Sequence, residues 1–355
     1  MSNGASSRRT GGFLSIGVRV TAVATVVLAT LGAVAAVSVA SPASASTRFR
    51  YRPEPTSTTT APPTTAAAAG SVLFGAATDT LAELNTFNTD AGKPASLYLS
   101  YSSFALSPDF DATTASAAAK MGATNMVTWE PWDPSNGSAS QPAYSLANIG
   151  AGSFDSYISR WAAEIKAWGQ PLWLRFAHEM NGNWYPWSGG VNGNTPAQYV
   201  AAFRHVHDLF VRAGVTNVTW VWTPNVDAPG FTPISQLYPG DQYVDWVGVD
   251  GYNWGTTQSW GSTWQTPSAV FATTLSELRA LTAKPIVIGE TASAEQGGSK
   301  AQWIQQFFSM LVSNPDIKAF VWFNINKETA WPVESSSTAQ AAFAAGIANS
   351  RYQAG

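Results

Sequence analysis

The feature that most constrains the fold is a series of eight short apolar segments, rich in β-branched and aromatic residues, between residues 72 and 324. Several are apolar on both faces, which is typical of parallel strands covered on both sides. The eight segments begin, in chain order, at Val72, Ser96, Asn125, Pro171, Asn217, Val244, Pro285 and Ile317. This pattern predicts eight parallel strands joined by longer connections.

Helices fit between these segments. Residues 153–168 and 196–213 have apolar positions at helical spacing, and Gly169 and Gly214 follow them as stop signals. A doubly wound sheet is less suitable, because it would usually carry a Gly-rich phosphate loop after its first strand, and this chain has none there. Eight β/α repeats match the size of a (β/α)8 barrel. We therefore expect an α/β fold, a (β/α)8 TIM barrel, formed as one domain by residues 71–355.

The first 45 residues have the pattern of an export signal. They contain no Asp or Glu, and basic residues at Arg8, Arg9 and Arg19 precede an apolar run and an Ala-Ser-Ala cleavage site. An uncleaved membrane anchor is the alternative, because 18 apolar residues could just span a bilayer. The region 46–70 is rich in Pro, Thr and Ala without hydrophobic periodicity. We expect a signal peptide at 1–45, a linker at 46–70 and a secreted protein.

Charge and composition exclude several kinds of function. Without the three Arg of the first 45 residues, 16 basic residues stand against 22 acidic ones, which argues against nucleic-acid binding. The chain has no Cys, and the pair His178-Glu179 lacks the second His of a zinc-binding HExxH motif. We therefore expect no metal. A serine nucleophile is equally unsupported, because the chain has no G-x-S-x-G motif.

Two glutamates stand at the ends of expected strands, where barrels carry their active sites. Period-2 alternation from Trp173 would place Arg175 and Glu179 on one strand face, toward the barrel axis. Glu290 ends the seventh segment and would lie at the same rim. All 16 Trp residues follow residue 128 and could supply faces for sugar rings. Two Glu in an aromatic cleft are the groups that hydrolyse glycosides, one as proton donor and the other as an ionised carboxylate.

The run RFAHEMNGNWYPW, with WVWTPN, VDWVGVDGYNW and PIVIGE, resembles glycoside hydrolase family 26 over residues 72–324. The resemblance implies a retaining (β/α)8 enzyme from a family dominated by β-mannanases. It implies that Glu179 is the general acid/base and Glu290 the nucleophile. It also implies an active-site His, a Trp after the NG turn, a Tyr that orients the nucleophile and a sugar platform on strand eight. These four are His178, Trp184, Tyr252 and Trp322.

Structural roles stay open for each of these residues. Glu179 could form an ion pair with Arg175, and Glu290 could cap a helix after Gly289. The histidine and the aromatic residues could pack the top of the barrel or seal a loop. Three further residues at strand ends are expected to provide cleft polarity, bind sugar or stabilise turns: Glu130, Asn225 and Asp250.

We therefore expect a retaining endo-β-glycosidase that cuts a polysaccharide, with β-1,4-mannan as the first candidate. Mixed-linkage β-glucan and β-xylan are alternatives, because Phe323 stands where some mannanases of the family carry Arg. A carbohydrate-binding barrel without turnover is the alternative of another class, and the presence of both Glu179 and Glu290 argues against it. We expect no cofactor, no nucleic-acid partner, no membrane contact beyond export or anchoring, and a monomer.

Overall fold

The computed structural model describes residues 70–355. The signal peptide expected at residues 1–45, and all but the last residue of the linker expected at 46–70, fall outside the described residues. Both stay predictions. Within the described part, no helix is long and apolar enough to pass through a bilayer.

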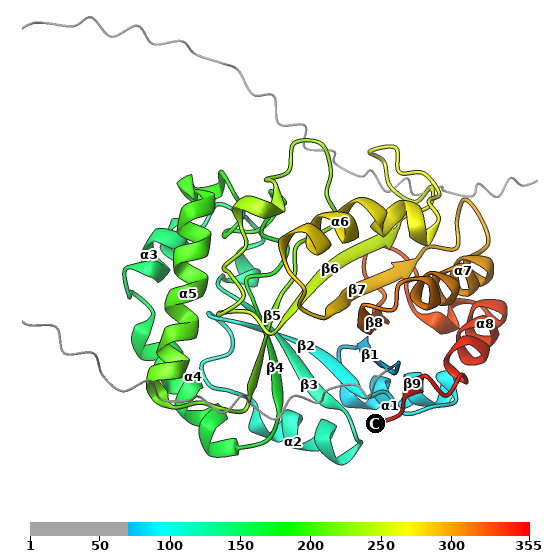
Figure 1. Cartoon of the computed structure of the whole chain (residues 1–355), viewed down its shortest axis with the longest axis horizontal. Helices are drawn as coiled ribbons and strands as arrows, with labels where there is room; N and C mark the ends of the chain where they lie inside the picture. The colour runs from blue at the N-terminus through cyan, green and yellow to red at the C-terminus, as the bar shows by residue number, and fades with distance from the viewer. Residues whose placement is uncertain (1–69) are drawn as a thin grey trace, which may run out of the picture. The chain divides into compact units, whose positions relative to one another are not determined.

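Eight parallel strands form a closed barrel (Figure 1). Strands that follow one another along the chain pair with each other, and β1 pairs with both β2 and β8, which closes the sheet. The strands are β1 (Val72–Ala77), β2 (Leu97–Ser103), β3 (Thr124–Glu130), β4 (Leu172–Phe176), β5 (Val218–Trp222), β6 (Trp246–Asn253), β7 (Ile286–Ser293) and β8 (Ile317–Phe323). A short strand, β9 (Tyr352–Gln353), pairs with the start of β1. All eight predicted strands are present, and the predicted (β/α)8 barrel is confirmed.

Helices surround the barrel, with α3, α4 and α5 on the side opposite α7 and α8 (Figure 1). The helices are α1 (Leu81–Ala91), α2 (Ala112–Lys120), α3 (Leu146–Gly150), α4 (Asp155–Trp168), α5 (Pro196–Ala213), α6 (Pro267–Leu281), α7 (Lys300–Ser313) and α8 (Ser337–Ile347). Between β5 and β6, where an ideal barrel has an α-helix, the described residues form only a short 3-10 helix, Ile234–Gln236.

The ends of the helices follow from local sequence. The Thr195 hydroxyl accepts a hydrogen bond from the Gln198 backbone N–H, the Thr195 backbone N–H donates to the Gln198 side chain in return, and Pro196 opens α5. Gly169 and Gly214 end α4 and α5 with left-handed φ values of 72° and 71°. Both stop signals were predicted from the sequence.

Much of the tryptophan content builds the core. Eight of the 16 Trp side chains are less than 2% exposed. Trp129 of β3, for example, stacks on Trp161 of α4 with ring centroids 4.7 Å apart. Burying large aromatic rings between sheet and helices contributes strongly to stability. An abundance of Trp is therefore weaker evidence for a sugar cleft than the sequence suggested.

Candidate active site

The chain leaves the extended conformation directly after β4. The strand ends at Phe176, and Ala177 and Glu179 have φ values of 47° and 52°, in a region that L residues rarely adopt. The Glu179 N–H donates to the Thr223 carbonyl oxygen at 2.8 Å, which holds the turn against β5. The predicted alternation through Glu179 is therefore wrong, because the turn rather than the strand positions this carboxyl group. Strained backbone of this kind is concentrated at functional sites.

A fully buried guanidinium joins the strands below the site. Arg175 Nη1 donates to Asp250 at 2.5 Å, and Nη2 donates to Glu290. Arg175 Nε and Nη2 also donate to Thr128 Oγ1, at 2.9 and 2.7 Å. The guanidinium therefore links β3, β4, β6 and β7. The alternative of an Arg175–Glu179 ion pair is wrong, because Arg175 binds the carboxylates on β6 and β7 instead.

Glu290 lies inside β7, so it does not cap a helix. It accepts hydrogen bonds from Arg175 and from the Tyr252 hydroxyl, the latter at 2.6 Å. Burial alone would raise the pKa of Glu290. The Arg175 charge and these hydrogen bonds stabilise the ionised form more strongly, and they lower the pKa to about 2. At neutral pH this carboxylate is charged, as a nucleophile must be.

Glu179 has the opposite electrostatic environment. It accepts hydrogen bonds from Trp184 Nε1 at 2.8 Å and from Asn225 Nδ2 at 2.6 Å, and it is 7% exposed. Burial and the charge of Glu290 raise the pKa of Glu179 to about 7, although the two hydrogen bonds act to lower it. A carboxyl group with this pKa can give up and take back a proton near neutral pH. The two predicted catalytic residues thus have pKa values displaced in opposite directions.

His178 is a buried, uncharged part of the site. Burial and the nearby Arg175 charge lower the pKa of His178 well below its usual value. Its Nδ1 atom has no hydrogen-bond partner, and its ring lies 4.9 Å from that of Tyr185 and 6.4 Å from that of Tyr101. The predicted substrate-binding role of His178 stays a prediction.

The one group of potential metal ligands found in the described residues consists of His178, Asp250 and Glu290, whose ligand atoms lie within 4.8 Å of one another. Both carboxylates already bind the guanidinium of Arg175. A divalent cation among these atoms would lie beside a fixed positive charge. This set of ligands suits the arginine, and we assign it no metal.

Trp184 lies beside the candidate proton donor, and its predicted substrate-binding role stays a prediction. Its indole N–H donates to Glu179, its ring is 37% exposed, and the ring packs edge-on against Phe231 at 5.3 Å. One part of the side chain therefore holds the carboxyl group while another part stays accessible. The Tyr252 hydroxyl donates to Glu290, which is the contact that a Tyr orienting the nucleophile would make.

The prediction that Trp322 forms a sugar platform is wrong. Its side chain is 0% exposed and packs against Trp303 of α7 and Phe343 of α8, with ring centroids 6.1 and 5.4 Å away. Alternation along β8 directs Trp322 outward to the helices. The next residue, Phe323, points toward the site and lies 5.7 Å from the Tyr252 ring. Trp322 cannot contact a substrate in the cleft.

Asn225 has a direct role that the sequence left open. Its side chain donates to Glu179, and paired hydrogen bonds of 2.8 and 2.9 Å with Asn181 fix its backbone. Its position three residues after the end of β5 was the available signal. Asp250 was similarly left open, and it is a buried partner of Arg175.

Glu130 supplies a third carboxyl group at the same rim. It lies at the end of β3, is 7% exposed and accepts a hydrogen bond from Trp132 Nε1 at 3.2 Å. Burial and the charge of Glu290 raise the pKa of Glu130 to about 7. This position agrees with the cleft polarity expected for Glu130.

The fold and the site together define a class of protein. A (β/α)8 barrel that holds one ionised and one protonatable carboxyl group at this end of its strands has the architecture of a glycoside hydrolase. Residues 143–307 match the family model of Glycosyl hydrolase family 26. This match confirms the resemblance to the family that the sequence motifs predicted.

Individual relatives add detail. Over 233 residues the chain is 46% identical to endoglucanase H of Acetivibrio thermocellus, covering 64% of this chain and 25% of that protein. Over 102 residues it is 28% identical to mannan endo-1,4-beta-mannosidase of Bacillus subtilis strain 168, covering 27% of each. The chain thus spans about a quarter of the length of these curated relatives. A family 26 β-mannanase structure from Bacteroides ovatus shares the fold, with a TM-score of 0.61 and 17% identity over 80% of this chain and 90% of that one.

Proposed function

We propose that this protein is a retaining endo-β-glycosidase with Glu290 as nucleophile and Glu179 as general acid/base. The observation that carries the proposal is the contrast between the partners of two buried carboxyl groups at one rim. Glu290 accepts hydrogen bonds from the charged Arg175 and from Tyr252, whereas Glu179 accepts them from the neutral side chains of Trp184 and Asn225. This contrast lowers the pKa of Glu290 and leaves that of Glu179 raised. Glu290 attacks the anomeric carbon while Glu179 gives its proton to the departing oxygen. Glu179 then takes a proton from water, which attacks the same carbon and releases Glu290.

The charge of Glu290 couples these two steps. That charge is one cause of the raised pKa of Glu179. When Glu290 becomes an ester in the glycosyl-enzyme, its charge is lost and the pKa of Glu179 must fall. Glu179 is therefore a proton donor before the intermediate forms and a base afterwards. A second base is not needed.

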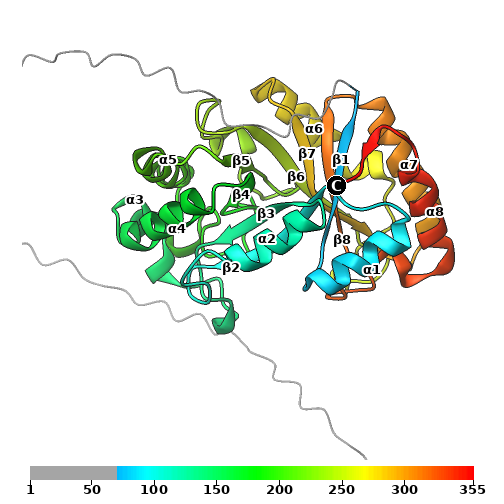
Figure 2. The ribbon, with the colours of Figure 1, turned by 90° about the horizontal axis from the view of Figure 1, so that it is seen from below.

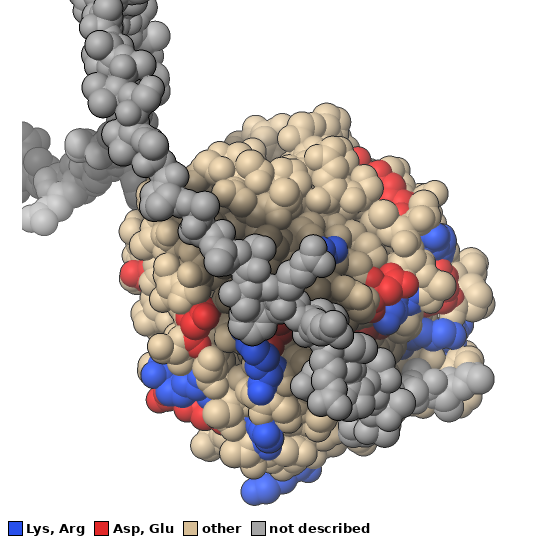
Figure 3. All heavy atoms as spheres, turned by 60° about the vertical axis from the view of Figure 1, so that its left-hand side comes forward, with Lys and Arg blue, Asp and Glu red and all other residues tan. Residues whose placement is uncertain are grey.

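For the substrate, we propose a neutral β-linked polysaccharide, with β-glucan ahead of β-1,4-mannan. The longer and stronger similarity to a protein named endoglucanase supports this order over the shorter similarity to a mannanase. Phe323 in place of the Arg of some mannanases supports it too. On the face shown in Figure 3, charged side chains form small separate groups among uncharged residues, which suits a neutral polymer.

We further propose that the protein is exported. The basic residues, apolar run and Ala-Ser-Ala site of residues 1–45 support this proposal. Polysaccharides too large to enter a cell would then be accessible to the enzyme.

Incubation with mixed-linkage β-glucan, galactomannan and β-xylan tests the proposal. We expect new reducing ends, released fastest from mixed-linkage β-glucan, together with an early fall in viscosity that indicates cleavage inside the chain. The first product should keep the β configuration when followed by NMR. A product first formed as the α anomer would contradict retention. Binding to a polysaccharide with no reducing ends released would favour the carbohydrate-binding barrel.

The pH profile tests the role of Glu179. We expect kcat/KM to fall as pH rises through about 7, because ionised Glu179 has no proton to donate. Trp184→Phe removes an N–H group that stabilises the ionised form, so the pKa of Glu179 should rise and the fall should move to higher pH. Trp260→Phe is the control, because this 67% exposed ring makes no hydrogen bond to Glu179 among the described contacts. An identical profile in wild type and Trp184→Phe would assign the titration to another group.

A further inference from the structure

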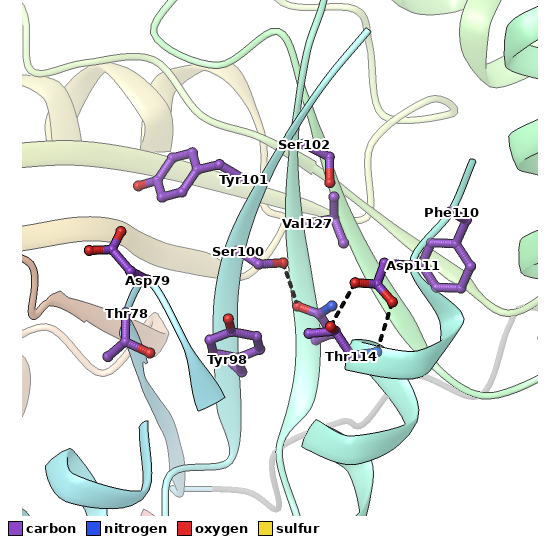
Figure 4. Close-up of a pocket in the computed structure, with 11 residues that line it drawn as sticks. Thr78, Asp79, Tyr98, Ser100, Tyr101, Ser102, Phe110, Asp111, Thr114 and Val127 are labelled. Carbon is purple, nitrogen blue, oxygen red and sulfur yellow. Dashed lines mark hydrogen bonds between the residues drawn. The ribbon is translucent and has the colours of Figure 1, made fainter. Parts of the chain in front are cut away.

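A pocket of about 260 Å³ lies on the flank of the barrel. Residues of β2, β3 and the N-terminal part of α2 line it, among them Tyr98, Asn125 and Thr114 (Figure 4). The helices α1 and α2 on this side of the barrel lie toward the viewer in Figure 2. Neither Glu179 nor Glu290 lines the pocket. The pocket therefore does not include the catalytic pair, although one of its lining residues, Tyr101, also interacts with Glu290.

Two polar groups that line this pocket have no hydrogen-bond partner in the described protein. Tyr98 is 3% exposed, yet its hydroxyl forms no hydrogen bond there. Asn125 is also 3% exposed, and its Oδ1 accepts from Ser100 at 3.0 Å, but its amide N–H groups have no acceptor. Burial and the neighbouring acidic residues, Asp79 first among them, raise the pKa of Tyr98 to about 12, so the hydroxyl keeps its proton. Neither atom is among the fully buried atoms without a partner, so both face the open space of the pocket, where a ligand can bond to them in place of water.

The charges around the pocket select the class of ligand. The described lining contains no Lys or Arg but two acidic residues, Asp79 and Asp111, which disfavours an anion. Both carboxylate oxygens of Asp111 are occupied by Thr114, at 2.9 Å from its backbone N–H and 2.6 Å from its hydroxyl. Only the Asp79 carboxylate is left, whereas Ca²⁺ or Mg²⁺ takes six or more oxygen ligands. A neutral ligand with several hydroxyl groups fits these donors and acceptors.

The aromatic residues and the volume of the pocket further restrict the kind of ligand that it suits. Three aromatic residues line the pocket, Tyr98, Tyr101 and Phe110, and aromatic rings are the groups that pack on the C–H face of a sugar. The volume lies just below the roughly 300 Å³ at which pockets for drug-sized ligands begin, so it suits about one ring. Tyr101 is 36% exposed, and its ring also lies 6.4 Å from His178. Tyr101 therefore stands between this pocket and the catalytic site.

We propose that this flank pocket is a second saccharide-binding site, which holds one sugar unit of the polysaccharide outside the catalytic cleft. The identity of the polysaccharide rests on the proposed function, whereas the unpartnered groups of Tyr98 and Asn125 do not depend on it. Binding of one unit here keeps the rest of the polymer close to the cleft and raises its effective concentration.

Electrophoresis of the folded protein through gels containing mixed-linkage β-glucan, and in parallel galactomannan, tests the proposal. The starting protein is Glu290→Gln, which binds without cleaving. Adding Tyr98→Phe and Asp79→Ala should raise the dissociation constant obtained from the retardation by roughly 3- to 10-fold, which is the effect of losing one or two hydrogen bonds. Adding Tyr352→Phe is the matched control. It removes the hydroxyl of a tyrosine on β9 that has no hydrogen-bond partner and does not line the pocket, and it should change nothing.

The outcomes separate the two proposals. Equal retardation of the pocket variant and the Tyr352→Phe control on both polymers, or no retardation of the starting protein, would overturn the second site. In protein that keeps Glu290, Tyr98→Phe with Asp79→Ala should leave kcat on a short oligosaccharide unchanged. If wild-type protein cleaves nothing while retardation still depends on Tyr98, the second site stands and the proposed catalytic function fails.

Discussion

Replacing Glu290 by Ala is expected to reduce hydrolysis of the polysaccharide by about 10⁴-fold or more, the scale seen when an enzyme loses its nucleophile. The remaining site should still bind substrate, because Glu179 keeps its partners Trp184 and Asn225. Sodium azide can enter the space left by the side chain and attack the anomeric carbon of an activated aryl glycoside. That single displacement should restore turnover and give a glycosyl azide of inverted configuration, which NMR identifies.

Two control variants show whether Glu290→Ala loses activity through the missing nucleophile or through damage to the fold. Glu290→Gln keeps the shape of the side chain and should be as inactive, with a melting temperature close to that of wild type. Glu277→Gln changes a carboxyl group on α6 outside the candidate site and should leave activity unchanged. Azide rescue with retained configuration, or substantial hydrolysis by Glu290→Ala, would remove Glu290 from the nucleophile role.

The strands were predictable because their signal is strong. Parallel barrel strands are covered on both faces, so each appears as an apolar run, and all eight runs are strands. Helix ends were predictable where Gly169 and Gly214 supply the left-handed conformation. Glu179 and Glu290 could be chosen because each follows an apolar run at the end where barrels carry active sites.

The same apolar character explains what the sequence left undetermined. When both faces of β8 are apolar, the pattern cannot tell which side chains face the axis, so Trp322 was placed in the cleft and Phe323 was not. On β4, strand alternation did not anticipate the positive φ values of Ala177 and Glu179. Long-range hydrogen bonds hold that turn, and no local pattern records them.

The roles of Asn225 and of the flank pocket could not be predicted for a related reason. Asn225 acts through Glu179, which lies 46 positions earlier in the chain. The flank pocket combines Asp79, Tyr98, Asn125 and Thr114 from four separate elements or connections. Such sites depend on how the barrel brings distant segments together, whereas a catalytic motif such as HEMNG is contiguous.

Replacing Glu179 by Ala should give a loss that depends on the leaving group. On polysaccharide, whose sugar alkoxide needs a proton to depart, we expect a loss of about 10²- to 10⁴-fold, the usual contribution of a general acid. A dinitrophenyl glycoside needs no such help, so Glu290 should still form the glycosyl-enzyme quickly. Release by water then lacks its base. Stopped-flow measurements should therefore show a burst of phenol followed by slow turnover.

Two further measurements on Glu179→Ala complete the test. Azide is a charged nucleophile and needs no base, and the variant lacks the carboxyl group whose ionisation lowers kcat/KM at high pH. Azide should accelerate the slow phase of Glu179→Ala and give a product of retained configuration, opposite to that of Glu290→Ala. The fall in kcat/KM through a pH of about 7 should disappear, since it reports the proton on Glu179. If both substrates lose the same activity, or the pH dependence persists, Glu179 contributes only charge or structure, and Glu130, whose pKa is also raised to about 7, becomes the proton donor to test.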